Sequence, residues 1–184
     1  MTEAPPARLI RTVVLVGMMG AGKTAIGRSL AARLGVDFVD SDTAIEEAAA
    51  LSIAEIFERD GERFFRRREA EVLRRLLSGP PGVVSTGGGA FLFDRNRTAI
   101  AEMGVAVWLD ADLDTLWERV RHKDTRPLLR TDDPKATLTA LFAERRPVYA
   151  QAGVRVSIDR AASIEETTDR VLDALSAHGN ILEG

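Results

Sequence analysis

The chain has 184 residues, no cysteine and a formal net charge of −3. This length is enough for one substantial core and too short for two ordinary domains, so we expect a single domain over residues 1–184. The absence of cysteine excludes disulfides and thiolate chemistry, and the slightly acidic balance argues against a broad nucleic-acid-binding surface. No apolar stretch approaches the roughly 20 residues that cross a bilayer, and no signal-peptide pattern precedes the first strand, so we expect a soluble, cytoplasmic protein without membrane contact.

Short runs rich in Val, Ile and Leu alternate along the chain with longer segments of helical period. Residues 23–34 and a segment near 164–175 both carry apolar residues at helical spacing. Ser52 and Ser163 each stand three residues before a glutamate, which is the capping-box pattern of a helix start. This alternation predicts an α/β fold with a parallel sheet covered by helices on both faces. The expected strands are 12–16, 37–40, 83–86, 105–109 and 154–158.

The sequence GMMGAGKT at residues 17–24 directly follows the first expected strand and opens a helix. It matches GxxxxGK[ST], a phosphate-binding loop. Glycines at these positions let backbone N–H groups surround phosphate oxygens, Lys23 reaches the β- and γ-phosphates, and Thr24 offers a hydroxyl to Mg²⁺. The loop therefore predicts ATP and one Mg²⁺ ion, with nucleotide contacts from Gly20, Ala21, Gly22, Lys23, Thr24 and Ala25.

Two carboxylates follow the second expected strand, at the sheet edge where the phosphate loop lies. Asp40 is suited to hold Mg²⁺ through water, and Asp42 to orient or deprotonate an acceptor hydroxyl. The third strand ends in Ser85 and Thr86 and offers no acidic residue for a metal, which favours Asp40. The alternative is that residues 40–42 only cap the next helix.

A helix is expected from about Gly61 to Ser78, and Glu69 falls inside its apolar stripe. A carboxylate there needs a partner, and Arg66 is the nearest candidate. The pair is either a clamp that presents a guanidinium to a substrate carboxylate or an ordinary exposed ion pair. Three consecutive glycines, Gly87–Gly89, follow the third strand. They indicate close approach of a ligand to the backbone, with a flexible turn as the alternative.

Further arginines lie in the second half of the chain. The polar stretch 122–135 is either a solvated loop or a lid that carries Arg126 to the ATP phosphates. Arg145 and Arg146 stand at an expected helix end, which they cap by charge unless the fold returns them to the cleft. Residues 177–184 are expected to be frayed.

These pieces together resemble the shikimate kinases over nearly the whole chain, through GMMGAGKT, FVDSD, SIAEIF, GERFFRRRE, VVSTGGGA, TRPLL and ERRPVY. The resemblance implies a three-layer P-loop kinase fold with a five-stranded parallel sheet, a substrate-binding segment at about 41–69 and a lid at about 121–133. It implies ATP-dependent phosphorylation of the 3-hydroxyl of shikimate, a step of aromatic amino-acid biosynthesis. We expect a monomer.

The resemblance also implies a role for each candidate residue. Lys23, Asp42 and Arg126 are the implied catalytic residues, and Arg119 lies against adenine. The implied shikimate contacts are Asp42 at the hydroxyl, Arg66 and Arg145 at the carboxylate, and Gly87, Gly88 and Gly89 along the pocket. Mg²⁺ is held by Thr24 and, through water, by Asp40.

Two positions depart from the usual pattern of this family. Ala25 lacks the hydroxyl that commonly follows the loop threonine, and Ala50 stands where glycine is usual. Two other classes stay open. A sugar-acid kinase of the gluconate type would share the phosphate loop but not the acceptor residues, and a non-catalytic nucleotide-binding module would lack them.

Overall fold

The computed structural model describes residues 7–122 and 127–184. At its centre is a five-stranded sheet in which every neighbouring pair of strands is parallel. This confirms the predicted α/β fold with a parallel sheet. The strands, in order across the sheet, are β3 (Phe38–Asp40), β4 (Val83–Ser85), β2 (Thr12–Val16), β5 (Gly104–Asp110) and β6 (Val154–Ser157).

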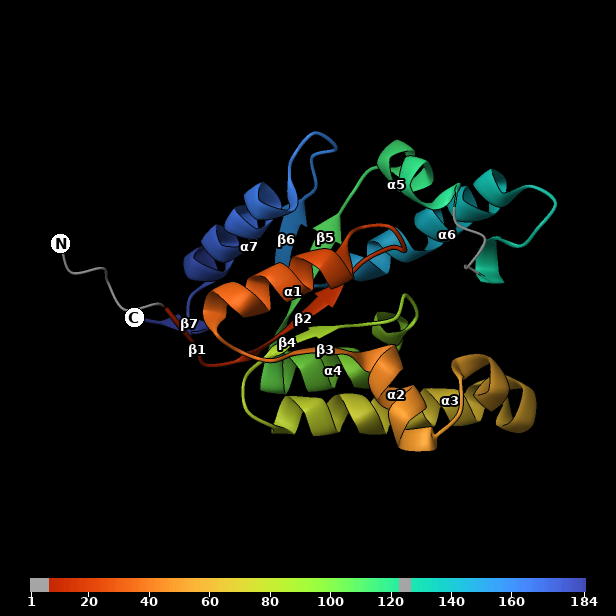
Figure 1. Cartoon of the computed structure of the whole chain (residues 1–184), viewed down its shortest axis with the longest axis horizontal. Coiled ribbons are helices and arrows are strands. Elements are labelled where there is room, and N and C mark those ends of the chain that lie inside the picture. Colours follow the sequence, from red (N-terminus) through yellow and green to blue (C-terminus); the bar gives the residue numbers. More distant parts are fainter. Residues whose placement is uncertain (1–6, 123–126) are drawn as a thin grey trace.

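Helices cover both faces of this sheet. Those in the described residues are α1 (Lys23–Leu34), α2 (Ser41–Ala49), α3 (Ile53–Ser78), α4 (Asp94–Met103), α5 (Leu113–Val120), α6 (Pro134–Tyr149) and α7 (Ile164–His178), with short 3-10 turns η1 (Ala90–Leu92) and η2 (Pro127–Leu129). Helices α1 and α7 pack together on one side of the sheet, and α3 and α4 pack together on the other (Figure 1). In the part of the chain that the structure describes, no helix is both long and apolar enough to cross a membrane.

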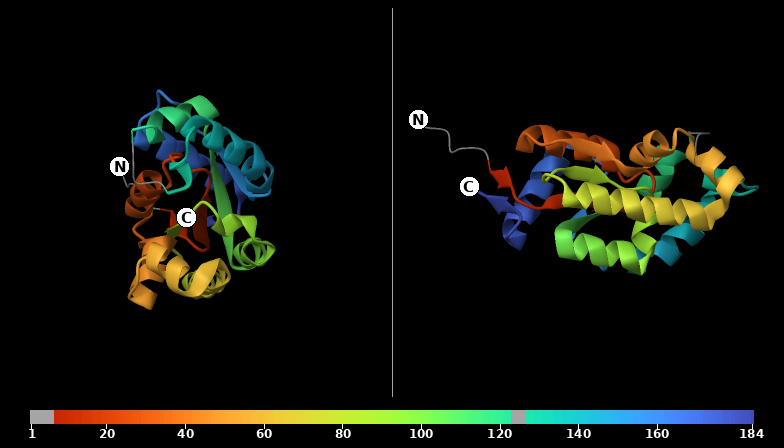
Figure 2. Two further views of the ribbon diagram at one scale, coloured as in Figure 1. Left: turned by 90° about the vertical axis from the view of Figure 1, so that its right-hand side faces the viewer. Right: turned by 90° about the horizontal axis from the view of Figure 1, so that it is seen from below.

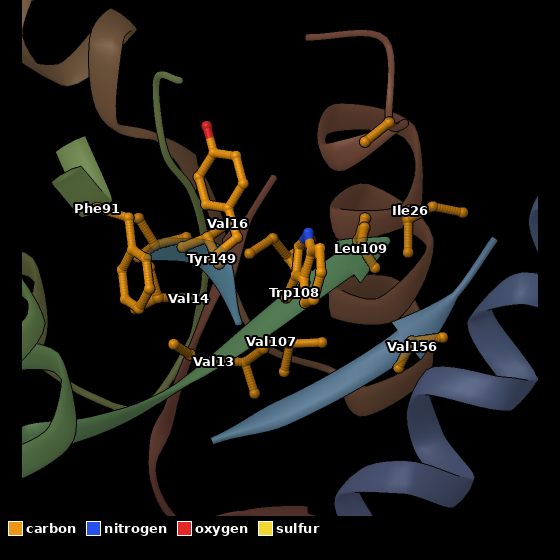
Figure 3. Close-up of a cluster of buried hydrophobic side chains, with 14 of the residues drawn as sticks. Val13, Val14, Val16, Ile26, Phe91, Val107, Trp108, Leu109, Tyr149 and Val156 are labelled. Atoms are coloured by element: carbon orange, nitrogen blue, oxygen red, sulfur yellow. The ribbon is translucent and has the colours of Figure 1, made fainter. Parts of the chain in front are cut away.

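The core lies between these layers. Every residue of β2 and β5 is buried, because helices cover both faces of the central strands. Side chains from β2, β5 and β6 meet those of Phe91 and Tyr149 in one cluster (Figure 3). Each fully buried Val or Leu in it contributes roughly 1.5–3 kcal/mol to folding. The cluster fixes the carboxyl ends of the strands, where the candidate site lies.

Helix starts agree closely with the sequence patterns. α1 spans the predicted residues, and its N-cap is Gly22 with φ 97°, a left-handed conformation that glycine adopts without strain. Both predicted capping boxes are present, at Ser52 and Ser163. The helix expected from Gly61 is the second half of α3, because Gly61 itself has φ 83° and ψ 171° and kinks the chain there.

The helix end predicted near Arg145 and Arg146 is confirmed. α6 ends at Tyr149, with Arg146 in its last turn and Pro147 inside the helix. Proline removes one backbone donor from a helix, which is tolerated here because the helix ends two residues later and Tyr149 is buried in the core. The backbone N–H of Ala150 still bonds to the carbonyl of Arg146.

The C-terminal residues are ordered, contrary to the expected fraying. Leu182–Glu183 forms β7, which pairs antiparallel with β1 (Arg8–Leu9). Ile181 is 0% exposed, and its carbonyl accepts a hydrogen bond from the backbone N–H of Ile10. Figure 1 and the right-hand view of Figure 2 show β1 and β7 at one end of the molecule and the first turns of α3 at the opposite end. The ends of the described chain are thus tied to the core far from the first turns of α3.

We expect Ile181→Ala to lower the free energy of unfolding by about 2–4 kcal/mol, because it leaves a cavity in a closed core. Ile10→Ala is the matched control, since Ile10 lies beside Ile181 but is 40% exposed. Its effect is expected to stay within about 0.5 kcal/mol. Urea unfolding of both variants tests this, and equal effects would show that the C-terminal residues are not part of the core.

Ala50 has φ 53° and ψ 33°, a left-handed conformation at the C-cap of α2. This geometry explains why glycine is usual there, because a Cβ atom makes it cost roughly 1–2 kcal/mol. We expect Ala50→Gly to raise the free energy of unfolding by about 0.5–1 kcal/mol in urea titrations at an unchanged m-value. Ala49→Gly, inside the helix, should lower it by about 1 kcal/mol. A loss of stability in both variants would contradict the strain argument.

Candidate functional site

A cavity of about 510 Å³ opens at the carboxyl ends of β2, β3 and β4. The phosphate loop forms one wall, the start of α2 and the glycine segment after β4 form the other, and α5 contributes an arginine. The cavity brings together predicted nucleotide, metal and acceptor residues from four segments of the chain. Its lining is Met19, Gly20, Gly22, Lys23, Thr24, Ala25, Asp40, Asp42, Ser85, Thr86, Gly87, Gly88 and Arg119.

The phosphate loop has the geometry of an anion site. α1 begins at the cavity with Lys23, and its first turn has no acidic residue, so the positive end of the helix dipole faces the cavity uncompensated. The Lys23 ammonium donates to the carbonyls of Gly17 and Met18, at 2.7 and 3.0 Å. Arg119 of α5 donates to the carbonyl of Gly20 at 3.0 Å. Two cations thus lie against the loop.

The two carboxylates after β3 have different surroundings. Asp40 is the N-cap of α2, and its carboxylate accepts the Thr43 backbone N–H at 3.1 Å, so this residue does cap the helix. Asp40 also lines the cavity. Asp42 lies in the first turn of α2 and faces the cavity. Burial, followed by the neighbouring charge of Asp40, raises the pKa of Asp42 from 3.8 to about 6, against the opposing effect of Lys23.

The three consecutive glycines lie against three charged side chains. A Cβ atom on any of them would come closer than 3 Å to the end of one such side chain, so each glycine gives a different charged group room to reach the backbone. The flexible-turn alternative does not explain this arrangement. The distances from that atom are 2.8 Å to Asp42 at Gly87, 2.8 Å to Arg145 at Gly88 and 2.6 Å to Arg66 at Gly89.

Arg66 is held on several sides. Its Nη1 donates to both carboxylate oxygens of Glu69, at 3.0 and 3.1 Å, and Glu69 is only 2% exposed. The guanidinium carbon lies 5.1 Å from the ring centroid of Phe65 and 5.0 Å from that of Phe93. Burial raises the pKa of Glu69, and the Arg66 charge opposes that shift. The predicted pairing is therefore correct and the exposed ion pair is not the right description.

The two adjacent arginines of α6 point to different partners. Arg145 is 8% exposed and lies against Gly88, which lines the cavity, although Arg145 itself is not among the lining residues. Arg146 instead pairs with Asp110 at 3.1 Å and lies over the ring of Trp108. Of the two residues, Arg145 is the one that reaches the glycine segment.

Two residues that were not among the predicted site residues anchor the last turn of α6. The hydroxyl of Tyr149 donates to the Gly88 carbonyl at 2.7 Å. Asp110, at the carboxyl end of β5, forms ion pairs with both Arg146 and Arg155. The sequence features that point to these two residues are weak. Tyr149 stands one helical turn after Arg145, and Asp110 ends a strand next to the phosphate-loop strand. Arg126, the expected lid arginine, lies outside the described residues.

The cavity fits a magnesium ion bound with a nucleotide better than a metal held by protein alone. Within residues 7–122 and 127–184, no three or more His, Cys, Asp or Glu residues gather into a metal cage. Thr24, Asp40 and Asp42 instead offer a few hard oxygen atoms along one cavity. Mg²⁺ commonly uses one or two protein oxygens and completes its shell with phosphates and water.

A phosphate loop after the central strand, opening into a cavity that also holds an acidic pair, defines a P-loop α/β protein that binds nucleotide. Comparison with known proteins gives the particular group. The shikimate kinase family profile matches residues 19–176. The chain belongs to the shikimate kinase family.

Individual relatives agree with this assignment. The chain is 63% identical to the shikimate kinase of Ruegeria pomeroyi over 177 residues, which covers 96% of this chain and 91% of that protein. It is 59% identical to the shikimate kinase of Cereibacter sphaeroides over 177 residues, which covers 96% and 88%.

Solved structures give the same result. The shikimate kinase of Acinetobacter baumannii in complex with shikimate superposes with a TM-score of 0.85 at 34% identity, covering 92% of this chain and 95% of that one. A gluconokinase from Sinorhizobium meliloti superposes with a TM-score of 0.58 at 21% identity, covering 92% and 94%. That second similarity shows the shared fold alone. The relatives therefore favour the shikimate kinase interpretation over the gluconate-type alternative.

Proposed function

We propose that this chain transfers the γ-phosphate of ATP to the 3-hydroxyl of shikimate, giving shikimate 3-phosphate and ADP. The observation that carries the proposal is the glycine segment, where an acid and two arginines each reach one glycine beside the phosphate loop. A carboxylate-bearing polyol needs this combination, with cations for its acid group and an acceptor for its hydroxyl proton.

The nucleotide side uses the phosphate loop. Backbone N–H groups of residues 20–25 surround the phosphates, Lys23 neutralises charge on the β- and γ-phosphates, and Arg119 lies against the adenine. Thr24 and, through water, Asp40 would hold Mg²⁺, which when bound offsets negative charge on the phosphates. Arg126 is proposed to reach the same phosphates from a lid over residues 121–133.

The acceptor side uses the opposite wall. Arg66 and Arg145 bind the shikimate carboxylate, with Arg66 kept in place by Glu69. Asp42 accepts the proton of the 3-hydroxyl as its oxygen forms a bond to the γ-phosphorus. The bond from that phosphorus to the β-phosphate oxygen breaks, and ADP leaves with those electrons. The raised pKa of Asp42 suits a group that must bind a proton during the reaction.

We further propose that residues 1–184 act as a single domain in which residues 41–69 bind the acceptor. We expect a monomeric, cytoplasmic enzyme that needs no nucleic acid and no membrane. Size-exclusion chromatography with light scattering measures whether the enzyme is a monomer.

A coupled ADP-release assay tests the activity. We expect turnover with shikimate and Mg-ATP, and turnover at least about 100-fold lower with gluconate, quinate or other hydroxy acids, because they place a hydroxyl or the acid group wrongly. Phosphorus NMR of the product should show one new ester at the 3-position. Equal turnover with gluconate, or ADP release that does not depend on an acid acceptor, would contradict the proposal.

A further inference from the structure

We propose that Tyr149 is a positioning residue for the acceptor pocket: its hydroxyl fixes the Gly88 carbonyl and so holds the glycine segment in the shape that binds shikimate. This inference rests on the proposed function, because it concerns the affinity for the acid acceptor.

The contact itself is short and enclosed. The Tyr149 hydroxyl donates to the Gly88 carbonyl at 2.7 Å, across 61 residues of sequence. The ring of Tyr149 is buried, with ring centroids of Trp108 and Phe91 at 6.4 and 6.5 Å. Figure 3 shows the hydroxyl directed away from the other labelled side chains of the cluster. The apolar core thus fixes the ring, and the hydroxyl is the polar end that reaches the site.

The glycine segment needs such a restraint. Glycine loses more backbone freedom on ordering than any other residue, so three in succession would sample many conformations if unrestrained. The turns within the segment are closed by long backbone bonds, from Ala90 to Gly87 at 3.3 Å and from Leu92 to Gly89 at 3.2 Å. If a minor fraction of the free enzyme has the binding shape, apparent affinity falls in proportion to that fraction.

Tyr149 also couples the segment to the carboxylate-binding helix. Arg145 precedes it by one turn of α6, and a Cβ atom on Gly88 would lie 2.8 Å from Arg145 and 4.0 Å from the Tyr149 hydroxyl. One residue further along the same helix, Arg146 pairs with Asp110 at the end of β5. The last turn of α6 is therefore attached both to the sheet, through Arg146, and to the glycine segment, through Tyr149, and Arg145 directly precedes these two attachments.

The hydroxyl remains a donor at neutral pH. Burial raises the pKa of Tyr149 above its usual 10.0, and the nearby Arg145 works against that shift. The phenol is thus protonated under assay conditions, and the hydrogen bond to the carbonyl persists.

The first test compares Tyr149→Phe with the wild-type enzyme. We expect the KM for shikimate to rise about tenfold, the factor that one lost hydrogen bond corresponds to, while the KM for ATP stays within about twofold. Thr168→Val is the matched control, because it also removes a buried hydroxyl, on α7. That hydroxyl bonds to the Ile164 carbonyl at 2.7 Å and to the Ser29 hydroxyl at 2.9 Å. The control should leave both KM values unchanged. This result would show that the loss of a buried hydroxyl elsewhere in the fold does not by itself raise the KM for shikimate.

Tyr149 is the only tyrosine of the chain, which allows a second test without substitution. Growth on 3-fluorotyrosine labels this position alone and keeps the ring and hydroxyl in place. We expect the fluorine NMR signal to shift when shikimate is added and to change far less when the non-hydrolysable nucleotide AMPPNP is added. This measurement decides the matter if Tyr149→Phe does not fold.

The outcomes separate the two proposals. Wild-type enzyme that does not phosphorylate shikimate would overturn the proposed function, and the inference with it. Active wild-type enzyme combined with an unchanged shikimate KM in Tyr149→Phe, or with equal rises in both KM values, would overturn the inference alone. So would a fluorine signal that shikimate does not move.

Discussion

Replacing Asp42 by asparagine is expected to reduce turnover with shikimate by roughly 10²–10⁴-fold, the usual contribution of a positioned general base. Asparagine keeps the size of the side chain beside Gly87 but cannot accept the hydroxyl proton. The affinity for ATP should stay near that of the wild type, because the phosphate loop is untouched. Steady-state kinetics and nucleotide titration measure the two effects separately.

Glu47→Gln is the matched control for that substitution, since Glu47 is an exposed carboxylate on the same helix. It should leave turnover and both KM values unchanged. Turnover in Asp42→Asn within about threefold of wild type would remove Asp42 from the proton transfer and leave it only a positioning role.

The same variant is expected to be more stable than the wild type when free of ligand and metal. The pKa of Asp42 is raised from 3.8 to about 6 in the folded protein, so folding favours the protonated acid. Wild-type stability therefore falls as pH rises from about 4 to 6, and the loss is fully present above that range. We expect Asp42→Asn to gain about 1–3 kcal/mol at pH 7.5 in EDTA, and the gain to shrink towards pH 4.

Urea unfolding at several pH values tests this gain. A difference between the two proteins that does not depend on pH would show that the buried charge is not its cause. A gain in stability together with a loss of turnover would show that the buried charge of Asp42 lowers the stability of the fold and is needed for catalysis.

Replacing Arg66 by methionine is expected to raise the KM for shikimate by roughly 100-fold, because a charged hydrogen-bonding partner of the substrate carboxylate is lost. Stability should fall as well, by roughly 3 kcal/mol near neutral pH, because Glu69 is left buried without its cation. Without Arg66 the pKa of Glu69 rises further, so this loss should be larger at pH 8 than at pH 5.

A second substitution separates the two losses. Arg66→Met combined with Glu69→Gln removes the buried charge, so it should recover much of the stability while the KM for shikimate stays high. Recovery of substrate affinity in the double variant would show that Arg66 acts through folding and does not bind the acceptor. Arg63→Met, an exposed residue of the same helix, should change neither quantity.

Local patterns predicted the parts of the site that depend on local geometry. The phosphate loop, the limits of α1 and the pairing of Arg66 with Glu69 all follow from the chemistry and spacing of neighbouring residues. The three glycines predicted a close approach, although the pattern alone could not say that the approaching groups belong to the protein itself. The parallel sheet followed from the alternation of strand and helix patterns. That prediction is reliable because many local patterns along the sequence agree with it.

The remaining features depend on contacts between distant segments. The pairing of β1 with β7 joins two strands of two residues each, too short to show any periodicity. The contact of Tyr149 with Gly88 depends on how α6 is rotated against the sheet, which no local pattern encodes.

The last turn of α6 imposes a constraint on chain length. Arg145 and Tyr149 reach Gly88, whereas Arg146 pairs with Asp110. An inserted or deleted residue would rotate everything beyond it by about 100° around the helix axis. No single rotation could then restore both the bond to Gly88 and the pair with Asp110. Homologous sequences should therefore tolerate exchanges of amino acids in this turn far better than gaps, even though it lies next to the end of a helix, where length variation is ordinarily common.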